Sequence, residues 1–243
     1  MTSNPSVSVI IPSFNRFEFL RRAIKSVEAQ TYNNYEIIVI NDGSSDKKYD
    51  KKNFSKEIKL INLSKNQKQI HGFGPGSIRN FGLDNAEGDF VAFLDDDDFW
   101  FPKKLEVQIH KMLKAKTFMS NSDALIGNGP YDKTKKYPSF LYEFYYKKNK
   151  EINYGKSYKY YFKKFEYPEF WDYKFVRRSN PIITSSVVVK RDIINKIGGF
   201  RNLPLAADLD CWRGLLQFTN SAFISEPLIY YDNFHGSGRN YSK

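Results

Sequence analysis

Four consecutive aspartates, Asp95 to Asp98, follow the short apolar run Phe90 to Leu94. Neighbouring carboxylates repel one another, by ~1 kcal/mol per pair at 4 Å in water and by more in a cleft. A bound cation would offset this repulsion, and oxygen ligands select Mg²⁺ or Mn²⁺, which commonly bridge protein carboxylates to substrate phosphates. The run therefore predicts a site for a hard cation, with a solvated acidic turn as the alternative. A calcium loop is less favoured, because no Gly and Glu follow at the required spacing.

The elements around the aspartates place them at the edge of a sheet. The run Phe90 to Leu94 has the length of a buried strand, and a helical pattern extends from about Pro102 to Ala115. The aspartates therefore sit at the carboxyl end of a strand. In open α/β sheets, ligands bind at that edge.

The first part of the chain alternates strands and helices. Val7 to Ile11 and Glu36 to Ile40 are β-rich apolar runs, and Ile58 to Leu63 is a weaker one. Between the first two runs, apolar residues recur at helical spacing, and Asn15 and Glu18 are spaced like a capping box. This alternation predicts an α/β fold with a Rossmann-like, mostly parallel central sheet flanked by helices.

Beyond the aspartates the pattern is less regular. It predicts strands at Ala124 to Gly127 and Ile182 to Val189, a short helix to Ile197, a helix at Asp208 to Phe218, and a strand pair at Ala222 to Tyr231 broken at Pro227. We expect residues 1–243 to form a single domain with two halves, 1–115 and 116–243, the second of which includes the insert 131–178.

Composition limits the class of protein. The chain has 243 residues, of which 41% are apolar, enough for a substantial core. Its one cysteine, Cys211, excludes an intrachain disulfide and fits a reducing, cytoplasmic setting. No apolar stretch is long enough for a signal peptide or a membrane span. We therefore expect a cytoplasmic protein, associated at most with the inner face of a membrane.

The net charge of +11 is concentrated in a basic aromatic insert, residues 131–178. This segment holds thirteen Lys or Arg against six Asp or Glu, together with eleven Tyr, six Phe and Trp171. Basic residues interleaved with aromatics can contact an anionic membrane surface or nucleic acid. An ordinary solvated insertion with extended lysines is an equal alternative.

Five segments together resemble glycosyltransferase family 2, whose members have the GT-A fold and are inverting enzymes that use nucleotide-sugar donors. The segments follow the family's order and are Val7 to Arg16, Ile37 to Asp46, Gly76 to Gly82, Gly88 to Asp98 and Ala207 to Trp212. The resemblance spans nearly the whole chain, and it implies that 1–115 is the nucleotide-sugar-binding half and 116–243 the acceptor-binding half. It implies transfer from a nucleoside diphosphate sugar, with UDP as the expected carrier, to a hydroxyl of a glycan or of a lipid-linked acceptor in surface polysaccharide synthesis.

The resemblance also implies a set of donor-binding residues. Those expected to contact the nucleotide sugar are Pro12, Ser13, Phe14, Asn15, Asp42, Arg79, Asp95 and Asp96. Asp42 suits the imide N–H of uracil, although capping its own turn is an alternative role. Arg79 is expected on a helix, where a guanidinium can bridge carboxylate or phosphate oxygens.

Within the aspartate run, the resemblance directs Asp95 at the ribose and Asp97 or Asp98 at Mn²⁺ or Mg²⁺. Alternation of side chains in an extended segment predicts that Asp96 faces away from the ion and is expendable. The metal would neutralise charge on the departing diphosphate.

Asp208 matches the family's catalytic base, which takes a proton from the attacking hydroxyl. Ala207 stands where the family has Glu, and this leaves the role of that Glu unfilled. Asp210 and Trp212 are expected to support the site, Trp212 as an acceptor platform. His235, in a tail with Gly236, Ser237 and Arg239, is expected to close over the diphosphate.

Two other classes remain open on sequence grounds. A sugar-1-phosphate nucleotidyltransferase shares the sheet and the metal, but has a Gly-rich loop and a Lys near the first strand, where this chain has Pro12 and Asn15. A non-catalytic module would use the basic aromatic insert to bind nucleic acid or membrane. We expect no nucleic acid partner.

Overall fold

The computed structural model describes residues 4–72, 76–143, 167–177 and 181–235. The strands are β1 (Val7–Ser13), β2 (Tyr35–Asn41), β3 (Ile58–Asn62), β4 (Phe90–Phe93), β5 (Phe99–Trp100), β6 (Met119–Gly127), β7 (Phe170–Trp171), β8 (Val188–Lys190) and β9 (Ser221–Asp232). The α-helices are α1 (Phe17–Glu28), α2 (Gln67–His71), α3 (Ile78–Leu83), α4 (Lys104–Ala115), α7 (Tyr173–Val176), α8 (Arg191–Lys196) and α9 (Ala207–Leu215). Short 3₁₀ helices are η1 (Lys47–Tyr49), η2 (Lys51–Asn53) and η4 (Thr184–Ser186).

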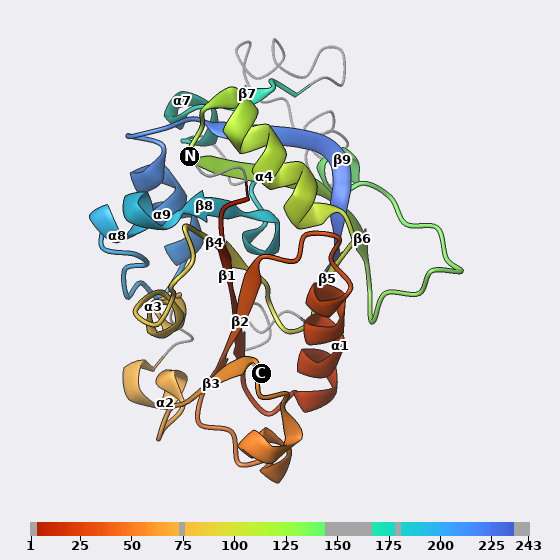
Figure 1. Ribbon diagram of the computed structural model, residues 1–243, viewed down its shortest axis with the longest axis vertical. Coiled ribbons are helices and arrows are strands. Elements are labelled where there is room, and N and C mark those ends of the chain that lie inside the picture. Colours follow the sequence, from red (N-terminus) through yellow and green to blue (C-terminus); the bar gives the residue numbers. More distant parts are fainter. Residues whose placement is uncertain (1–3, 73–75, 144–166, 178–180, 236–243) are drawn as a thin grey trace.

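One sheet runs through both halves of the described chain (Figure 1), in the order β3-β2-β1-β4-β8-β6-β9-β5, with β7 on β9. Strands β3, β2, β1 and β4 are parallel, as the alternating pattern predicts. The part beyond β4 is mixed, because β8 pairs antiparallel with both β4 and β6, whereas β6 and β9 are parallel. The carboxyl ends of β1 and β2 are in register, with Ser13 opposite Asn41.

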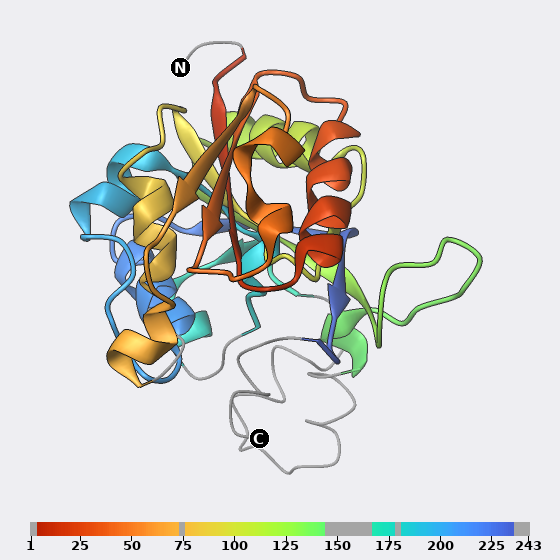
Figure 2. The ribbon, with the colours of Figure 1, turned by 90° about the horizontal axis from the view of Figure 1, so that it is seen from below.

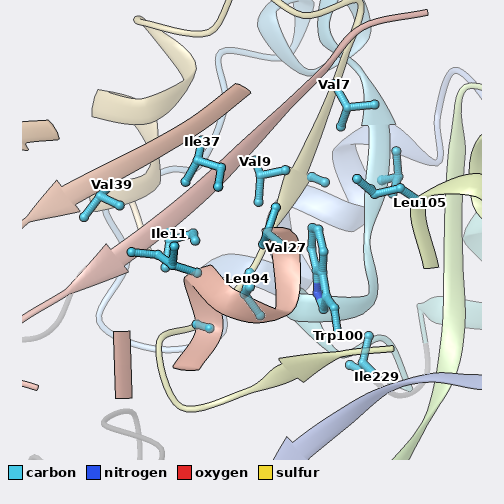
Figure 3. Packing of buried hydrophobic residues seen from close by; sticks show 14 of the residues in the cluster. Val7, Val9, Ile11, Val27, Ile37, Val39, Leu94, Trp100, Leu105 and Ile229 are labelled. Carbon is cyan, nitrogen blue, oxygen red and sulfur yellow. The ribbon is translucent and has the colours of Figure 1, made fainter. Parts of the chain in front are cut away.

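Helices cover both faces of the sheet (Figure 2), and each layer has its own apolar core. On one face, α1 and α4 bury Leu20, Val27 and Leu105 against β1 and Trp100 (Figure 3). On the other, α3, α8 and α9 contribute Leu83, Ile194, Trp212 and Leu215. Burial of one such side chain contributes about 1.5–3 kcal/mol, so both layers hold the sheet edge that carries the aspartates.

Three local predictions are wrong. Helix α1 has no side-chain cap, because Asn15 adopts a left-handed φ of 51° and directs its side chain to the next loop instead of to Glu18. Strand β8 starts only at Val188, because the segment before it forms η4. Pro227 does not break β9, and lies opposite Asp123 at an irregularity in the pairing with β6, a place where a strand tolerates proline.

The basic aromatic insert lies partly outside the described residues, which include only its parts 131–143 and 167–177. Trp171 in β7 is fully buried and stacks on Phe223, with ring centroids 4.4 Å apart. This tryptophan is therefore a core residue and not an exposed membrane anchor. Within the described parts of the chain, no helix is long and apolar enough to cross a membrane.

Candidate active site

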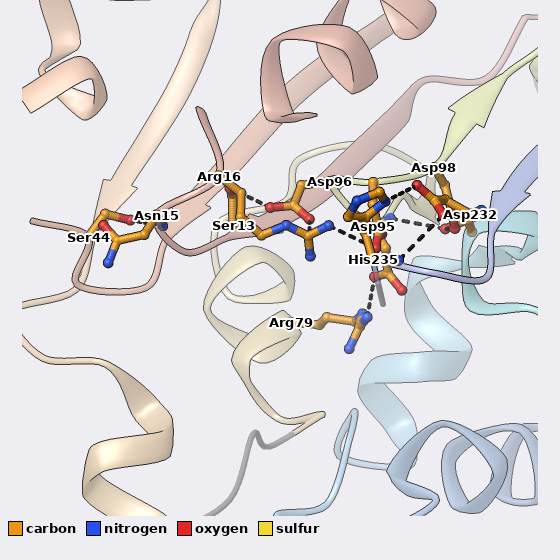
Figure 4. Close-up of polar contacts among 12 residues, drawn as sticks. Ser13, Asn15, Arg16, Ser44, Arg79, Asp95, Asp96, Asp98, Asp232 and His235 are labelled. Atoms are coloured by element: carbon orange, nitrogen blue, oxygen red, sulfur yellow. Dashed lines mark hydrogen bonds and ion pairs between the residues drawn. The ribbon is translucent and has the colours of Figure 1, made fainter. Parts of the chain in front are cut away.

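The loops after β1 and β2 are joined by Asn15. Its backbone N–H donates to Ser44 Oγ (2.9 Å), and its Oδ1 accepts from the Ser45 N–H (3.0 Å) (Figure 4). Pro12, near the end of β1, and Phe14, in the loop that follows, are half-buried. The two loops thus form one unit at the carboxyl edge of the parallel strands, where the sequence predicts the base and ribose of the donor.

Asp42 lies at the start of the second loop and is only 5% exposed. Its two oxygens accept hydrogen bonds from Asn66 Nδ2 and from the Gln67 N–H, both at 2.8 Å. Burial raises the pKa of Asp42 to about 6, although the Gln67 N–H opposes the shift. The carboxylate is therefore fixed by residues of α2 and its cap, and not by its own turn.

The four aspartates form a turn, because the Asp98 N–H donates to the Asp95 carbonyl at 3.1 Å. The expectation of alternating side chains in an extended segment is therefore wrong. Asp96 is buried, accepts a hydrogen bond from Ser13 Oγ (2.7 Å) and pairs with Arg16 Nη1 (3.2 Å), contacts that do not suit an expendable residue.

The other three aspartates each have a different partner. Asp95 contacts the Arg79 guanidinium from α3, and Asp97 Oδ2 lies 2.9 Å from Arg16 Nη2. Asp98 is fully enclosed: its Oδ2 accepts from Ser185 Oγ and its Oδ1 from the Asp232 N–H (3.0 Å). Ser185 Oγ also accepts from the Asp95 N–H (3.0 Å), so η4 supports both ends of the turn.

Crowding and burial raise the pKa values in the turn. Burial is the largest cause, and it raises the pKa of Asp96 to about 7, with Asp97 adding and Arg16 opposing. Burial, with Asp97 and Asp95 adding, also raises the pKa of Asp98 well above its ordinary value, although the hydrogen bonds from Ser185 and the Asp232 N–H oppose the shift. Burial lowers the pKa of Arg16, but Asp96 and Asp97 outweigh burial and raise it. A positive charge bound at the turn would therefore stabilise the ionised form of these carboxylates.

The carboxy-terminal tail reaches the same place. His235 Nδ1 lies 2.7 Å from Oδ2 of Asp232, which is fully buried and also accepts from the Gly129 N–H (2.9 Å). The His235 ring contacts Phe19 of α1, with centroids 4.8 Å apart. The other tail residues singled out from the sequence, Gly236, Ser237 and Arg239, lie outside the described residues.

Helix α9 carries Asp208 in its first turn, half-buried. This turn lies against the segment before Arg79, because a Cβ added to Gly76 would come within 2.5 Å of the Ala207 Cβ. Asp210 pairs with Arg201, whose Nε is 2.7 Å from Oδ2. Asp208 therefore directly follows a residue that packs against the segment leading to Arg79, the arginine that contacts Asp95.

Trp212 has no exposed surface and packs against Phe93 and Phe200. The expectation that it forms an acceptor platform is wrong, since the Trp212 ring is enclosed in the core between α9 and the sheet.

Three residues of this cluster were not expected from the sequence. Arg16 ends the segment Val7 to Arg16, directly after Asn15, and a positive charge beside a ligand-binding loop is a signal that could have indicated it. Asp232 precedes His235 by three residues, and an acidic residue at that distance can orient an imidazole. Ser185 gave no signal, because its partners are 87 and 90 residues away in the chain.

The residues of the site suit a divalent cation whose remaining ligands come from the substrate. Among the described residues, no group of three His, Cys, Asp or Glu side chains is arranged to hold a metal. Asp97 offers carboxylate oxygens, and a positive group, Arg16, already stands against them. Mg²⁺ and Mn²⁺ commonly take one or two protein carboxylates and draw further ligands from substrate phosphates. The donor set suits such a shared site.

Replacing Ser185 with Ala should lower the free energy of unfolding by about 1–3 kcal/mol, because the buried Asp98 carboxylate and Asp95 N–H both lose a partner. Ser186→Ala is the matched control: within the described residues the Ser186 hydroxyl bonds only the Ile183 carbonyl, which still accepts from the Ser186 N–H in the variant. Urea denaturation measures both. Equal losses for the two variants would show that η4 does not support the aspartate turn.

The fold and the cluster define an α/β protein with acidic and basic groups gathered at the carboxyl edge of parallel strands, the arrangement of a nucleotide-binding enzyme. The profile of the family described as Glycosyl transferase family 2 matches residues 8–169. The chain belongs to this family, as its five segments predict.

Relatives and solved structures agree with the family. An uncharacterized glycosyltransferase of Rickettsia typhi is 31% identical over 94% of this chain and 64% of its own length. The Escherichia coli UDP-Glc:alpha-D-GlcNAc-diphosphoundecaprenol beta-1,3-glucosyltransferase WfgD is 41% identical over 50% of this chain and 47% of its own. The crystal structure of S. aureus TarS 1-349 in complex with UDP-GlcNAc superposes with a TM-score of 0.66 at 18% identity, over 96% of this chain and 60% of that one. The GT-A fold expected from the sequence is thereby confirmed, and the chain spans less than two thirds of each relative's length.

Proposed function

We propose that the chain transfers a sugar, with inversion, from a UDP-sugar to a hydroxyl of a lipid-linked glycan, with the aid of Mn²⁺ or Mg²⁺. The observation that carries the proposal is the aspartate turn, whose four carboxylates are held by β1 and the loop after it, α3, η4 and the end of β9 at one edge of the sheet. The names of two similar proteins support the donor and the acceptor class, since WfgD is described with UDP-Glc and a diphosphoundecaprenol acceptor, and TarS was solved with UDP-GlcNAc.

In this proposal the residues of the candidate site have separate roles. Asp42 accepts the imide N–H of uracil in the loop pair that Asn15 joins, and Asp95 accepts from the ribose while Arg79 holds it. A divalent cation at Asp97 would supply Lewis-acid neutralisation of the diphosphate charge. Asp208 takes the proton of the acceptor hydroxyl, and His235, oriented by Asp232, faces the diphosphate. Residues 131–178, with an excess of seven positive charges, are our candidate for contact with anionic lipid at the membrane surface where such an acceptor resides.

Thermal-shift measurements with UDP-glucose, UDP-GlcNAc and GDP-mannose test the donor class. A ligand that binds only the folded chain stabilises it, by about 2.7 kcal/mol at 100 times its Kd. We expect a shift with a UDP-sugar in Mn²⁺ that falls in EDTA, followed by transfer of labelled sugar to a lipid diphosphate acceptor. Absence of any shift, together with salt-sensitive binding of RNA or DNA, would instead favour the non-catalytic module.

The affinity for uridine should depend on pH through Asp42. Its pKa in the free protein is raised to about 6, and protonation would replace an acceptor oxygen with a donor. Binding through the ionised form is therefore full above pH 7 and falls by about tenfold per unit as the pH drops below 6. Calorimetric or NMR titration with uridine, which lacks phosphates, isolates this group. Asp42→Asn should bind weakly at every pH, and a flat profile in the unmodified chain would remove Asp42 from base recognition.

A further inference from the structure

Arg16 supplies the aspartate turn with a counter-cation from its own chain. Its Nη1 lies 3.2 Å from Asp96 Oδ1 (Figure 4), and its Nη2 lies 2.9 Å from Asp97 Oδ2. The Arg16 side chain is 20% exposed, whereas the two carboxylates are 6% and 5% exposed. The guanidinium therefore closes the turn from the solvent side, at carboxylates that could otherwise hold a divalent cation.

The aspartates would respond differently to movement of Arg16. Asp96 would keep Ser13, and Asp98 would keep Ser185 and the Asp232 N–H. Within the described part of the chain, Arg16 is the one side-chain partner of Asp97. Departure of Arg16 therefore frees Asp97 while the rest of the turn stays in place.

Arg16 also has support that does not depend on the carboxylates. Its guanidinium carbon lies 4.7 Å from the centroid of the Phe19 ring, which the His235 ring contacts as well. Cation–π contacts of this kind contribute about 0.5–2 kcal/mol. A guanidinium that leaves Asp97 can thus stay over Phe19, beside the tail, where a diphosphate could accept two of its N–H groups.

We propose that Arg16 and the divalent cation compete for Asp97, and that the donor diphosphate completes the exchange by taking the released guanidinium. The inference rests on the proposed function, since it names the step by which that same site loads its cation. It predicts that the metal binds weakly without nucleotide, and that metal and UDP each strengthen the binding of the other.

Replacing Arg16 with Gln tests the competition without measuring transfer. The loss of free Mn²⁺ signal in electron paramagnetic resonance gives the affinity for Mn²⁺ alone. Because the competing pair joins two charged groups, Arg16→Gln should bind Mn²⁺ about tenfold more tightly than the unmodified chain. The ratio of UDP affinities with and without Mn²⁺, measured by calorimetry, should fall in the variant, since the diphosphate no longer gains the guanidinium.

Arg22→Gln is the matched control, because Arg22 also contacts the Phe19 ring (4.5 Å) and its loss changes the net charge equally. It should leave both quantities unchanged. Arg16→Lys keeps the positive charge but loses the bidentate geometry of the guanidinium, and it should bind Mn²⁺ with an affinity between those of the unmodified chain and Arg16→Gln. If Arg16→Gln does not fold, the Lys variant tests the competition in its place. Unchanged or weaker Mn²⁺ affinity in both Arg16 variants would overturn the proposed competition but not the proposed function. Failure of the unmodified chain to bind UDP even with Mn²⁺ would overturn the proposed function, and the inference with it.

Discussion

Replacement of Asp208 with Asn is expected to slow sugar transfer by about 10²- to 10⁴-fold, the usual contribution of a general base. The amide keeps the size of the carboxylate but cannot take the proton of the acceptor hydroxyl. Asp208 stands in the first turn of α9, where its neighbour Ala207 packs against Gly76 in the segment that leads to Arg79. Donor binding should be retained, so the loss should appear in kcat with an unchanged Kd for the UDP-sugar.

Asp210→Asn is the matched control for this measurement. Asp210 lies on the same helix two residues further on, where its carboxylate pairs with the exposed Arg201. We expect a small change in stability and little change in kcat, because an exposed ion pair contributes only about 0–1 kcal/mol. Near-normal turnover of Asp208→Asn, or an equal loss in both variants, would exclude Asp208 as the base.

Replacement of Asp97 with Asn should weaken Mn²⁺-dependent binding of UDP by about 10- to 100-fold or more, as is typical when the surroundings of a bound metal are altered. Of the four carboxylates, Asp97 is held among the described residues by one side chain, that of Arg16. Calorimetry of UDP with Mn²⁺ and with EDTA separates the metal-dependent part of the affinity from the rest.

Asp98→Asn is the informative comparison, because the sequence alone made Asp97 and Asp98 near-equal candidates for the metal. Both Asp98 oxygens already accept hydrogen bonds inside the protein, from Ser185 and from the Asp232 N–H. We therefore expect Asp98→Asn to lower the free energy of unfolding while UDP binding keeps its dependence on Mn²⁺. The reverse result, with dependence lost in Asp98→Asn and kept in Asp97→Asn, would move the metal to Asp98.

The parallel half of the fold was predictable, because each of its strands is a short apolar run followed by a turn and a helical pattern. The half after the aspartates was harder. Strand β9 pairs with β6, about a hundred residues away, and with the short β5 and β7, and such pairings leave no periodic mark in the sequence. The segment before Val188 reads as a strand by its β-branched residues, but Ser186 bonds the Ile183 carbonyl and folds it into η4.

In the candidate site, too, some residues were predictable from the sequence and others were not. Asp42, Arg79 and Asp95 lie near the carboxyl ends of the parallel strands, as their positions in the sequence predict. Trp212 was misplaced because its type suits both a sugar platform and a core, and only packing against Phe93 and Phe200 distinguishes these. Arg16 was overlooked because the sequence gives its charge but not its direction.

By itself, the sequence determined the chemistry of the site: four carboxylates that require positive charge, placed by the preceding apolar run at the ligand-binding edge of an α/β sheet. Only the tertiary structure decided how they divide the work, with Asp95 on Arg79, Asp96 and Asp97 on Arg16, and Asp98 enclosed by Ser185 and Asp232. The physical reason is that local pattern sets which groups are present and which strand end they follow. Their partners come from segments up to 134 residues away, and only sheet pairing and packing bring these within hydrogen-bond distance.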